Sequence, residues 1–510
     1  MASDTTDAAD APGPADAAGT TAATSGVAPV TVGALASRLE DSAIAARIVG
    51  DGAATVVGAT HDSRAVGPGQ LFACLRGESF DGHRFAGAAV EQGAGALLVD
   101  HDLGDEAAGR AQIVVDDTRR AVGHVASLAW GDPSRELATV GITGTNGKTT
   151  TAQIVAAMLD AAGRSAGVIG TLHGPRTTPE APELASTLRG FVARGERAAV
   201  MEVSSHALAL HRVDGTRFDV VAFTNLGHDH LDLHGSPEAY FRAKSALFDA
   251  AFAPVAVIDV DDPHGSVLAD AVGDRTGPGA MRVVEVSVGD LDELSVGVAS
   301  HSYRWRGRRV EVPLGGDFNV ANSLLAVSIV AELDVDLDAA LGGLSRLEPV
   351  RGRFEVVASP IADERGVTVV VDYAHTPDGL ERVLEAARAV ARGRVVAVFG
   401  CAGGRDREKR PVMGRIAARL ADVAIATSDN PRGEDPVAIL DEVVAGVEPR
   451  DRSTVTAQPD RRLAIREALA VAHDGDVVVI AGKGHERTQD LGHDVIDFDD
   501  REVALEELHP

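Results

Sequence analysis

One stretch, Gly141-Ile-Thr-Gly-Thr-Asn-Gly-Lys-Thr-Thr-Thr151, places a glycine-rich turn and a lysine between an apolar run and a helical pattern. A turn of this kind exposes unpaired backbone N–H groups at a helix N-terminus, and the lysine adds positive charge. The stretch therefore predicts a strand, a phosphate-binding turn and a helix, with ATP or GTP as the ligand. It is a shorter variant of the P-loop, because Ile142 stands where the strict pattern has its first glycine. A plain glycine turn is the alternative.

Composition and charge limit the classes of protein to which the chain can belong. A length of 510 residues predicts roughly two to four domains. The formal net charge of −28 argues against binding to nucleic acid or to an anionic membrane surface. The two cysteines, Cys74 and Cys401, cannot build a disulfide framework, which favours a reducing compartment. No apolar run approaches the roughly 20 residues of a membrane helix, and the first 37 residues lack Lys and Arg, so we expect a cytoplasmic protein without a signal peptide.

Alternating apolar runs and helical patterns divide the chain into a tail and three predicted α/β domains. Residues 1–27 contain almost no large apolar side chains, so we expect them to be disordered. We predict a small α/β domain at 28–136, a central domain with a P-loop-type parallel sheet at 137–348, and a Rossmann-like domain at 349–510. The predicted strands are 70–75, 95–99, 112–115, 137–143, 198–203, 218–224, 255–260, 367–371, 395–399, 423–427 and 477–481. Ligands of such domains bind at the carboxyl ends of the strands and between domains.

Acidic residues and histidines follow two of the central strands. Glu202 lies at the end of a strand downstream of the phosphate turn, where a nucleotide-bound Mg²⁺ finds a ligand, with Thr149 as the other. The segment Phe223-Thr-Asn-Leu-Gly-His-Asp-His-Leu-Asp-Leu-His234 suggests metal or phosphate binding but does not fix the metal. A surface glutamate and a solvated loop are the alternatives. Lys244 lies in an amphipathic helical pattern, which alone predicts a charge facing solvent.

Two motifs follow strands of the third domain, Asp429-Asn-Pro-Arg432 and Gly482-Lys-Gly-His-Glu486. Because both lie at carboxyl ends of strands, we expect them to face one crevice. An arginine there can pair with a carboxylate and a glutamate can hold an ammonium, which predicts an amino-acid substrate. Taken alone, each motif could equally be an ordinary turn. In the first domain, His61-Asp-Ser-Arg64 and Asp81-Gly-His83 flank a strand and offer polar groups to a ligand, although such residues are more often part of loops.

With these motifs in this order, the chain resembles the Mur ligases over about residues 30–505. Further matching motifs are Tyr240-Phe-Arg-Ala-Lys244, Phe318-Asn-Val-Ala-Asn322, Arg353-Phe-Glu355, Asp372-Tyr-Ala-His-Thr-Pro377 and Lys409-Arg-Pro411. The resemblance implies ATP-dependent amide ligation, in which a substrate carboxylate is converted to an acyl phosphate and an amine then displaces the phosphate. It implies that meso-2,6-diaminopimelate is added to the D-Glu of UDP-N-acetylmuramoyl-L-Ala-D-Glu in peptidoglycan precursor synthesis. ATP, Mg²⁺ and a monomer without nucleic-acid or membrane partners are implied as well.

The resemblance also implies roles for individual residues. ATP would be bound by Gly144, Thr145, Asn146, Gly147, Lys148, Thr149, Thr150, Asn322, Arg353 and Asp372. In the UDP-substrate, the UDP end would be bound by His61, Ser63, Glu78, Ser79 and Phe80, and the muramoyl-dipeptide by Thr177, Thr178, Ser204 and Arg212. Diaminopimelate would be bound by Arg405, Asp429, Asn430, Pro431, Arg432, Gly482 and Glu486. The metal ligands would be Thr149, Glu202, His230 and a carbamylated Lys244, and the catalytic residues would be Lys148, His230 and Lys244.

The arginine of Asp429-Asn-Pro-Arg432 implies which amino acid is added. In the family this arginine accompanies meso-diaminopimelate, whose distal carboxylate it can pair with, whereas lysine offers an ammonium at that place. We therefore expect a strong preference for meso-diaminopimelate over L-lysine. The chain departs from the family pattern at Gly227-His228, where Ser-Arg is usual, and at Gly404, where an aspartate is usual.

Two other functions remain open. One is a sister ligase that adds another amino acid, or a folylpolyglutamate synthase, which shares the phosphate turn; the UDP-type first domain and Asp429-Asn-Pro-Arg432 argue against it. The other is a paralogue that binds a UDP-sugar or ATP without catalysis. The presence of Lys148, Glu202, His230 and Lys244 argues against that.

Overall fold

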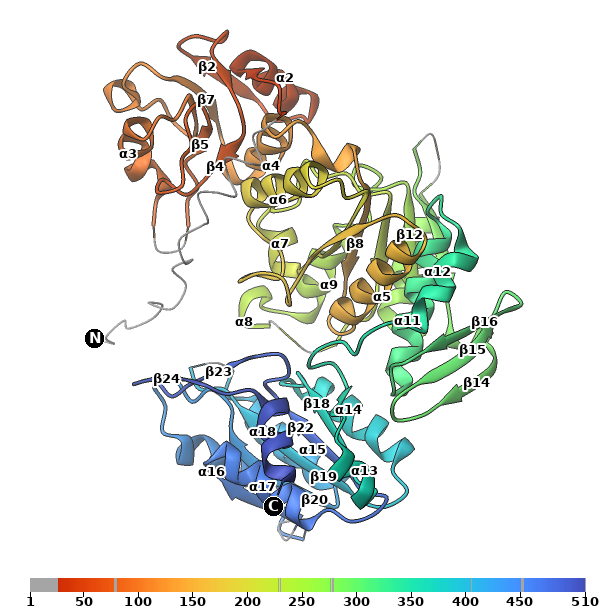
Figure 1. Cartoon of the computed structure of the whole chain (residues 1–510). Helices are drawn as coiled ribbons and strands as arrows, with labels where there is room; N and C mark the ends of the chain where they lie inside the picture. The colour runs from red at the N-terminus through yellow and green to blue at the C-terminus, as the bar shows by residue number, and fades with distance from the viewer. Residues whose placement is uncertain are drawn as a thin grey trace.

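The computed structural model describes residues 26–77, 80–227, 229, 231–275, 277, 279–404, 406–450 and 454–509. These residues form three α/β lobes that follow one another along the chain, with the central lobe between the other two (Figure 1). The predicted fold class is therefore confirmed. Of the tail that we expect to be disordered, residues 1–25 lie outside the described residues. In the described ranges, no helix is both long enough and apolar enough to cross a bilayer.

The N-terminal lobe is a mixed sheet with helices packed against it. Its strand order is β2-β7-β6-β5-β4, in which β2 is antiparallel to β7 and the other neighbours are parallel. The strands are β1 (Val30–Thr31), β2 (Ala46–Val49), β3 (Thr55–Val56), β4 (Ala59–Thr60), β5 (Leu71–Ala73), β6 (Ala96–Val99) and β7 (Ala111–Val115). The helices are α2 (Val32–Asp41), α3 (Ala86–Glu91) and α4 (Thr118–Ala129), with short 3₁₀ turns η1 (Gly82–Phe85), η2 (Gly104–Ala107) and η3 (Pro133–Arg135).

The central lobe is built on a parallel sheet with the order β13-β12-β11-β8-β10-β9. Its inner strands are apolar and buried, as expected for strands covered by helices on both faces. The strands are β8 (Ala138–Thr143), β9 (Ala166–Ile169), β10 (Ala198–Glu202), β11 (Val220–Phe223), β12 (Val255–Asp259) and β13 (Arg282–Val286). The helices are α5 (Lys148–Ala161), α6 (Ala181–Ala193), α7 (Ser205–Ala209), α8 (Leu231–His234), α9 (Pro237–Ser245), α10 (Pro263–Gly273), α11 (Asp317–Ala331) and α12 (Leu337–Leu344). Helices α11 and α12 pack against α5, the helix that follows the phosphate turn.

An antiparallel sheet attached to the central lobe is absent from the sequence prediction. It has the order β14-β15-β16, formed by β14 (Asp292–Val296), β15 (His301–Trp305) and β16 (Arg308–Val312), after the short turn η4 (Val288–Asp290). In β15, buried His301, Tyr303 and Trp305 alternate with half-buried polar residues. The sheet buries one face only, so it lacks the continuous apolar run by which the inner strands of the large sheets were predicted.

The C-terminal lobe contains the second large sheet, with the order β17-β18-β22-β19-β20-β21. Strand β17 is antiparallel to β18, and the remaining neighbours are parallel. The strands are β17 (Glu355–Val356), β18 (Thr368–Asp372), β19 (Val395–Cys401), β20 (Val423–Ser428), β21 (Val455–Gln458) and β22 (Val477–Ala481), with a hairpin of β23 (Thr488–Asp490) and β24 (Val495–Asp497). The helices are α13 (Pro360–Arg365), α14 (Pro377–Val390), α15 (Lys409–Leu420), α16 (Pro436–Ala445), α17 (Arg461–Val471) and α18 (Asp500–Leu508).

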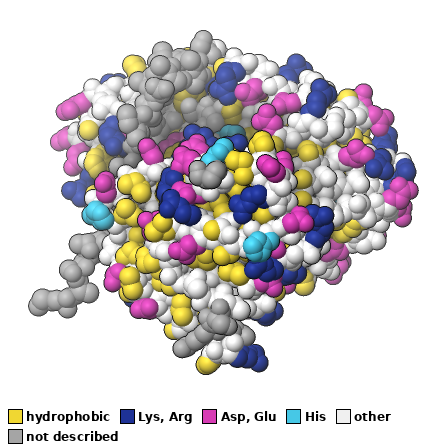
Figure 2. All heavy atoms as spheres, turned by 60° about the horizontal axis from the view of Figure 1, so that its bottom comes forward, with side chains coloured by type: hydrophobic (Ala, Val, Ile, Leu, Met, Phe, Trp, Pro, Cys, Tyr) yellow, Lys and Arg dark blue, Asp and Glu magenta, His cyan; other side chains and the backbone are white. Residues whose placement is uncertain are grey.

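The surface carries charges of both signs. On the face drawn in Figure 2, Lys and Arg side chains are interspersed with Asp and Glu side chains. The chain as a whole has 76 acidic residues against 48 Lys and Arg. This face therefore does not offer the continuous basic field that attracts nucleic acid or anionic lipid.

Candidate functional site

The phosphate turn connects β8 to α5, and two of its glycines are required by close contacts. Gly144 has φ +147°, and a Cβ atom there would lie 1.8 Å from the hydroxyl of Thr224. Gly147 has φ +88°, and its Cβ would lie 2.2 Å from the side-chain oxygen of Asn322. Both conformations are accessible to glycine and disfavoured for other residues. The turn thus lets its backbone approach a ligand at the N-terminus of α5, and the buried side-chain nitrogen of Asn146 has no hydrogen-bond partner among the described residues.

Two lysines converge on the backbone of this turn. Lys148 Nζ donates to the carbonyls of Gly144 (2.9 Å) and Thr145 (2.8 Å), and Lys244 Nζ donates to the Gly144 carbonyl (2.7 Å). Burial lowers the pKa of both ammonium groups, and the charge of Lys148 lowers the pKa of Lys244 further. Lys244 is 1% exposed, so the helical pattern alone predicted its environment wrongly. The buried side chains of the short helix α9 are Tyr240 and Lys244. An amphipathic pattern predicts that the charged residue faces solvent, so it does not predict this arrangement.

A carboxylate lies beside the first turn of α5. Glu202 ends β10 and is 2% exposed, and its Oε2 accepts a hydrogen bond from the Thr149 hydroxyl at 2.9 Å. Its Oε1 accepts from the backbone N–H of Thr171 at 2.9 Å. A carboxylate and a hydroxyl are hard oxygen donors of the kind that Mg²⁺ prefers, so this pair fits the ion. Asp229 lines the same cavity and acts electrostatically on both buried lysines. His230, the other predicted ligand, lies outside the described residues.

A cavity of about 540 Å³ opens between the central and C-terminal lobes at this point. The predicted ATP residues that line it are Thr145, Asn146, Gly147, Lys148, Thr149, Thr150, Asn322, Arg353 and Asp372. Across the lobes, Arg353 donates to the Thr149 hydroxyl at 3.2 Å and lies 4.6 Å from the Tyr373 ring centre. The carboxylate of Asp372 accepts backbone hydrogen bonds from Phe354 (2.6 Å) and Ala374 (2.8 Å).

Sequence reasoning missed several residues that line the cavity, among them Thr171, Asp259, Asp261 and Asp262. Asn225, Asp229, Tyr373 and His375 line it as well and belong to motifs that the sequence singled out. Burial and two neighbouring aspartates raise the pKa of Asp259 to about 6. Asp259 is the last residue of β12, and Asp261 and Asp262 follow it. Their position at the carboxyl end of a predicted strand is the signal that could have identified them.

The residues predicted to hold the muramoyl-dipeptide lie together beside Glu202. The Thr178 hydroxyl donates to the Glu202 carbonyl (2.8 Å) and accepts from the Ser204 N–H (3.0 Å). Thr177 contacts Thr171 through their hydroxyls at 3.0 Å. Arg212 donates to the Thr178 carbonyl at 3.3 Å, and its buried Nε has no partner among the described residues.

The residues predicted to hold the UDP end are only partly described. His61 Nε2 lies 3.9 Å from Glu183, and His61 Nδ1 is buried without a hydrogen-bond partner in the described part of the chain. Ser63 is half-buried and Phe80 is 66% exposed. Glu78 and Ser79 lie outside the described residues.

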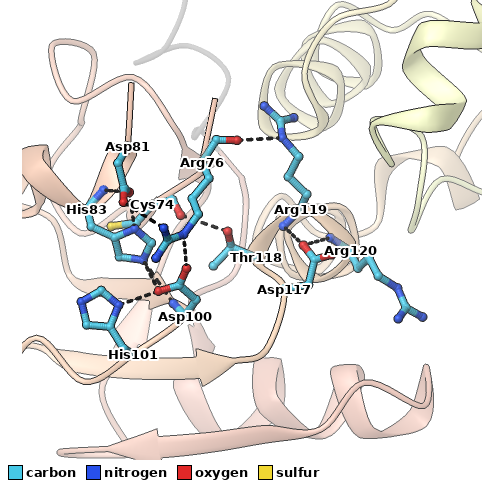
Figure 3. A network of polar contacts seen from close by, with 10 residues as sticks. All are labelled: Cys74, Arg76, Asp81, His83, Asp100, His101, Asp117, Thr118, Arg119 and Arg120. Carbon is cyan, nitrogen blue, oxygen red and sulfur yellow. Dashed lines mark hydrogen bonds and ion pairs between the residues drawn. The ribbon is translucent and has the colours of Figure 1, made fainter. Parts of the chain in front are cut away.

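The segment Asp81-Gly-His83, which we expect to offer polar groups to a ligand, makes hydrogen bonds within the N-terminal lobe (Figure 3). His83 is 6% exposed; its Nδ1 lies 2.6 Å from Asp81, and its Nε2 accepts the backbone N–H of Asp100 at 3.2 Å. Arg76 donates to the Asp100 carboxylate at 2.5 Å. His83, Asp100 and His101 have ligand atoms within 4.8 Å of one another, but hydrogen bonds already occupy His83 and a guanidinium already neutralises Asp100. This cluster therefore stabilises the lobe.

The two motifs of the C-terminal lobe, which we predict to face one crevice, contact each other through their side chains. The side-chain amide of Asn430 donates to Glu486 Oε2 at 2.9 Å. Asp429 is buried, while Arg432 is half-buried, has φ +55°, and donates its backbone N–H to the Asp490 carbonyl at 3.1 Å. The N–H of Gly482 donates to the carbonyl of Asp372 at 3.1 Å, which connects this crevice to the ATP cavity. Pro431 is buried next to Arg432, and Arg405 lies outside the described residues.

Three family descriptions match successive parts of the chain. They are "Mur ligase family, catalytic domain" at residues 55–130, "Mur ligase middle domain" at 142–330, and "Mur ligase, glutamate ligase domain" at 352–484. The chain is 41% identical to the UDP-N-acetylmuramoyl-L-alanyl-D-glutamate–2,6-diaminopimelate ligase of Syntrophomonas wolfei, with 89% of this chain and 94% of that protein covered. The chain belongs to the Mur ligase family. The ligase of the same description from Streptomyces coelicolor is 42% identical to this Mur ligase, with 90% and 93% covered.

Solved structures of Mur ligases have the same fold. A UDP-N-acetylmuramoyl-L-alanyl-D-glutamate–2,6-diaminopimelate ligase is 32% identical with a TM-score of 0.64, and 89% of this chain and 95% of that chain are covered. A Mycobacterium tuberculosis folylpolyglutamate synthase is 20% identical with a TM-score of 0.56, over 72% of this chain and 92% of that chain. At that identity the likeness concerns the fold alone.

Proposed function

We propose that this Mur ligase adds meso-2,6-diaminopimelate to the D-Glu of UDP-N-acetylmuramoyl-L-Ala-D-Glu at the expense of ATP. The observation that carries the proposal is the cavity between the central and C-terminal lobes. It joins a glycine turn, Lys148 and the Glu202 carboxylate to Arg353 and Asp372 of the other lobe. Such a cavity can hold a nucleoside triphosphate next to a substrate carboxylate. The Gly482–Asp372 hydrogen bond brings the two C-terminal motifs, proposed to bind the amino acid, close to this cavity. Peptidoglycan precursor synthesis in the cytoplasm is the setting that this activity implies.

ATP would bind with its phosphates on the turn at residues 144–150 and its nucleoside towards Asn322 and Asp372. Lys148 then holds positive charge at the γ-phosphoryl group while it moves to the D-Glu carboxylate, and Arg353 reaches the same place from the other lobe. Thr149 and Glu202 would hold a Mg²⁺, which neutralises phosphate charge when bound. The lobes exclude water from the acyl phosphate until the amine attacks and phosphate leaves.

Lys244 would act after modification. Its amine is buried, its pKa is lowered by burial, and its Nζ contacts the Gly144 carbonyl of the phosphate turn. A neutral amine can attack CO₂ and lose a proton, which yields a carbamate and converts a cation into an anion. A carbamate at this point would balance the charge of Lys148 and serve, with His230, as a metal ligand.

The UDP-substrate and the amino acid would occupy opposite sides of the cavity. His61 Nδ1 and Arg212 Nε are buried without partners among the described residues, so both are available to the anionic UDP-dipeptide. In the C-terminal crevice, Arg432 would pair with the distal carboxylate of meso-diaminopimelate and Glu486 would accept an ammonium. Arg405, outside the described residues, remains a predicted partner of the amino acid. We expect a monomer to suffice, because each proposed group comes from one chain.

Phosphate release tests the proposal directly. The purified protein is mixed with ATP and Mg²⁺, and each of the two other substrates is omitted in turn. We expect release only when UDP-N-acetylmuramoyl-L-Ala-D-Glu and meso-diaminopimelate are both present, with one amide product formed per phosphate. Release that needs neither the UDP-dipeptide nor the amino acid would contradict the proposal, and so would binding of ATP without any turnover.

A further inference from the structure

The chain uses lysine very sparingly, and its lysines lie at the proposed site. Of 48 lysines and arginines, only four are lysines, namely Lys148, Lys244, Lys409 and Lys483. Lys148 and Lys244 contact the phosphate turn. Lys409 Nζ donates to the carbonyl of His375, which lines the ATP cavity. A compact ammonium with three donors and a planar guanidinium are not interchangeable. Lys483 carries the remaining ammonium in a chain whose other basic side chains are arginines.

Lys483 is fully buried, and each of its three donors has an acceptor. Its side chain is 0% exposed. Nζ donates to Glu486 Oε2 at 2.8 Å, to the Thr488 carbonyl at 2.6 Å and to Asn430 Oδ1 at 3.3 Å. The ammonium is thus saturated by protein groups and does not point a free donor at a substrate. Any contribution to the reaction must act through these partners.

The first consequence concerns Glu486 and Asn430, which close a ring of hydrogen bonds with Lys483. Glu486 Oε2 accepts from Lys483 and from the Asn430 amide, whereas Oε1 makes no hydrogen bond within the described residues. Burial favours the neutral carboxyl, but the charge and hydrogen bond of Lys483 together with the hydrogen bond of Asn430 hold the pKa of Glu486 below its usual range. The ring therefore keeps Glu486 ionised with one oxygen free for an incoming ammonium.

The second consequence concerns Arg432. The Thr488 carbonyl that Lys483 binds belongs to β23, and Asp490 at the other end of β23 accepts the Arg432 backbone N–H at 3.1 Å. Asp490 also donates its N–H to Asn430 Oδ1 at 3.0 Å, the atom that Lys483 binds. Arg432 has φ +55°, a conformation that a non-glycine residue keeps only when its surroundings hold it. Through β23, Lys483 fixes the strained turn that carries this arginine.

We infer that Lys483 is a positioning residue that sets the selectivity of this site for an amino acid with an ammonium and a second carboxylate. One buried ammonium fixes both Glu486 and Arg432, the two charged groups that recognise the opposite charges of such a substrate. This inference rests on the proposed function. It differs from that proposal in assigning selectivity to a residue that does not touch the substrate.

The test compares Lys483→Met with Arg365→Met. Arg365 is the control because it is also a cation of the C-terminal lobe that donates to backbone carbonyls. Its acceptors are the carbonyls of Leu469 and Ala472 at the C-terminal end of α17, outside the two motifs. Wild type and variants are assayed by phosphate release with meso-diaminopimelate, L-lysine and ATP as varied substrates. For Lys483→Met we expect the KM for meso-diaminopimelate to rise at least about 10-fold, which is the loss expected when a buried charge loses its partner. The KM for ATP should stay within about 2-fold of wild type.

The ratio of kcat/KM for meso-diaminopimelate to that for L-lysine separates positioning from mere stability. It should fall at least about 10-fold in Lys483→Met and stay unchanged in Arg365→Met. An unchanged ratio in a folded Lys483→Met protein would overturn the inference, even if its unfolding temperature falls. If Lys483→Met does not fold, Lys483→Gln, which keeps a donor for the Thr488 carbonyl, is assayed with the same two outcomes. Wild type that shows no diaminopimelate-dependent release would instead contradict the proposed function.

Discussion

The central and C-terminal lobes use the same architecture for two different kinds of binding. In both, the candidate residues lie at the carboxyl ends of parallel strands. In the central lobe, the candidate site consists of a glycine-rich backbone turn and two lysines. Among the described residues, Lys148 Nζ and Lys244 Nζ donate only to backbone carbonyls. In the C-terminal lobe, the buried cations are paired with carboxylates, Lys483 with Glu486 and Arg461 with Asp500. Under the proposed function, the phosphates of ATP would meet ammonium groups that donate to no carboxylate, whereas the amino acid would meet charges that are already paired and fixed in orientation.

The difference has an energetic consequence. A buried cation that donates only to carbonyl groups is unfavourable, because it has lost its hydration. Removing it leaves no carboxylate without a hydrogen-bonded partner. Removal of one member of a buried pair does leave one, at a cost of about 3 kcal/mol or more. Substitutions of Lys148 and Lys244 in the central lobe should therefore affect activity with little loss of stability, and substitutions of paired cations in the C-terminal lobe should affect both.

The largest effect on activity is expected for Lys244→Ala. The variant loses the group proposed to become a carbamate, and kcat should fall about 1000-fold, while the unfolding temperature stays equal or rises because a desolvated ammonium is gone. Phosphate release and thermal unfolding measure the two quantities, and short carboxylates such as acetate should restore part of the rate. Full activity of the alanine variant would rule the role out.

Gly144→Ala should come next, with kcat/KM for ATP about 100-fold lower. A Cβ at this position would lie 1.8 Å from the Thr224 hydroxyl and 3.1 Å from the Asn225 nitrogen, so the turn must move. Gly342→Ala in α12 is the matched control, since a Cβ there meets nothing within 4 Å. Equal kinetics of the two variants would mean that the close approach of the turn is not needed for ATP.

Arg432→Gln should reduce selectivity and leave ATP binding intact. The distal carboxylate of meso-diaminopimelate would lose a charged partner, worth about 2 kcal/mol or roughly 30-fold in kcat/KM. The value for L-lysine should change little, because its distal ammonium gains nothing from an arginine. Competition between the two amino acids, with products separated by mass, gives the ratio, and an unchanged ratio would place the specificity elsewhere.

The smallest effect on activity is expected at His301, which joins the β15 strand to α11. Its Nε2 contacts the Ser323 hydroxyl at 2.8 Å, and burial lowers its pKa to about 4. In the unfolded chain, His301 has a pKa near 6.5, so it binds a proton at a higher pH than in the folded protein. The contribution of His301 to the free energy of unfolding therefore falls by about 3 kcal/mol as the pH drops from about 6.5 to about 4. Urea unfolding followed by Trp305 emission in the Trp130→Phe background checks this. We expect His301→Gln to flatten the pH dependence, and an equal slope in both proteins would contradict the assignment.

The inner strands of the two large sheets could be predicted because each is a continuous buried apolar run. The edge strands β9, β13, β17 and β21 were not predicted, because they are short or have half-buried and exposed positions. The antiparallel sheet at 292–312 could not be predicted, since one exposed face breaks its apolar runs. The phosphate turn and Glu202 were found because local spacing determines their chemistry. Lys244 shows the limit of that reasoning, because its burial depends on the Gly144 carbonyl, 100 positions away along the chain. Lys483 belongs to a motif that the sequence singled out, but its role could not be predicted. That role depends on Asn430 and Thr488, which the fold brings close to Lys483.

The central step of the proposed reaction is activation of a carboxylate by phosphoryl transfer. Oxygen labelling tests this step most directly. UDP-N-acetylmuramoyl-L-Ala-D-Glu labelled with ¹⁸O in the acceptor carboxylate is turned over with ATP and meso-diaminopimelate, and the released phosphate is analysed by mass spectrometry. An acyl phosphate passes one carboxylate oxygen to phosphate when the amine displaces it. We predict one ¹⁸O in each phosphate formed; unlabelled phosphate in step with amide formation would contradict the account.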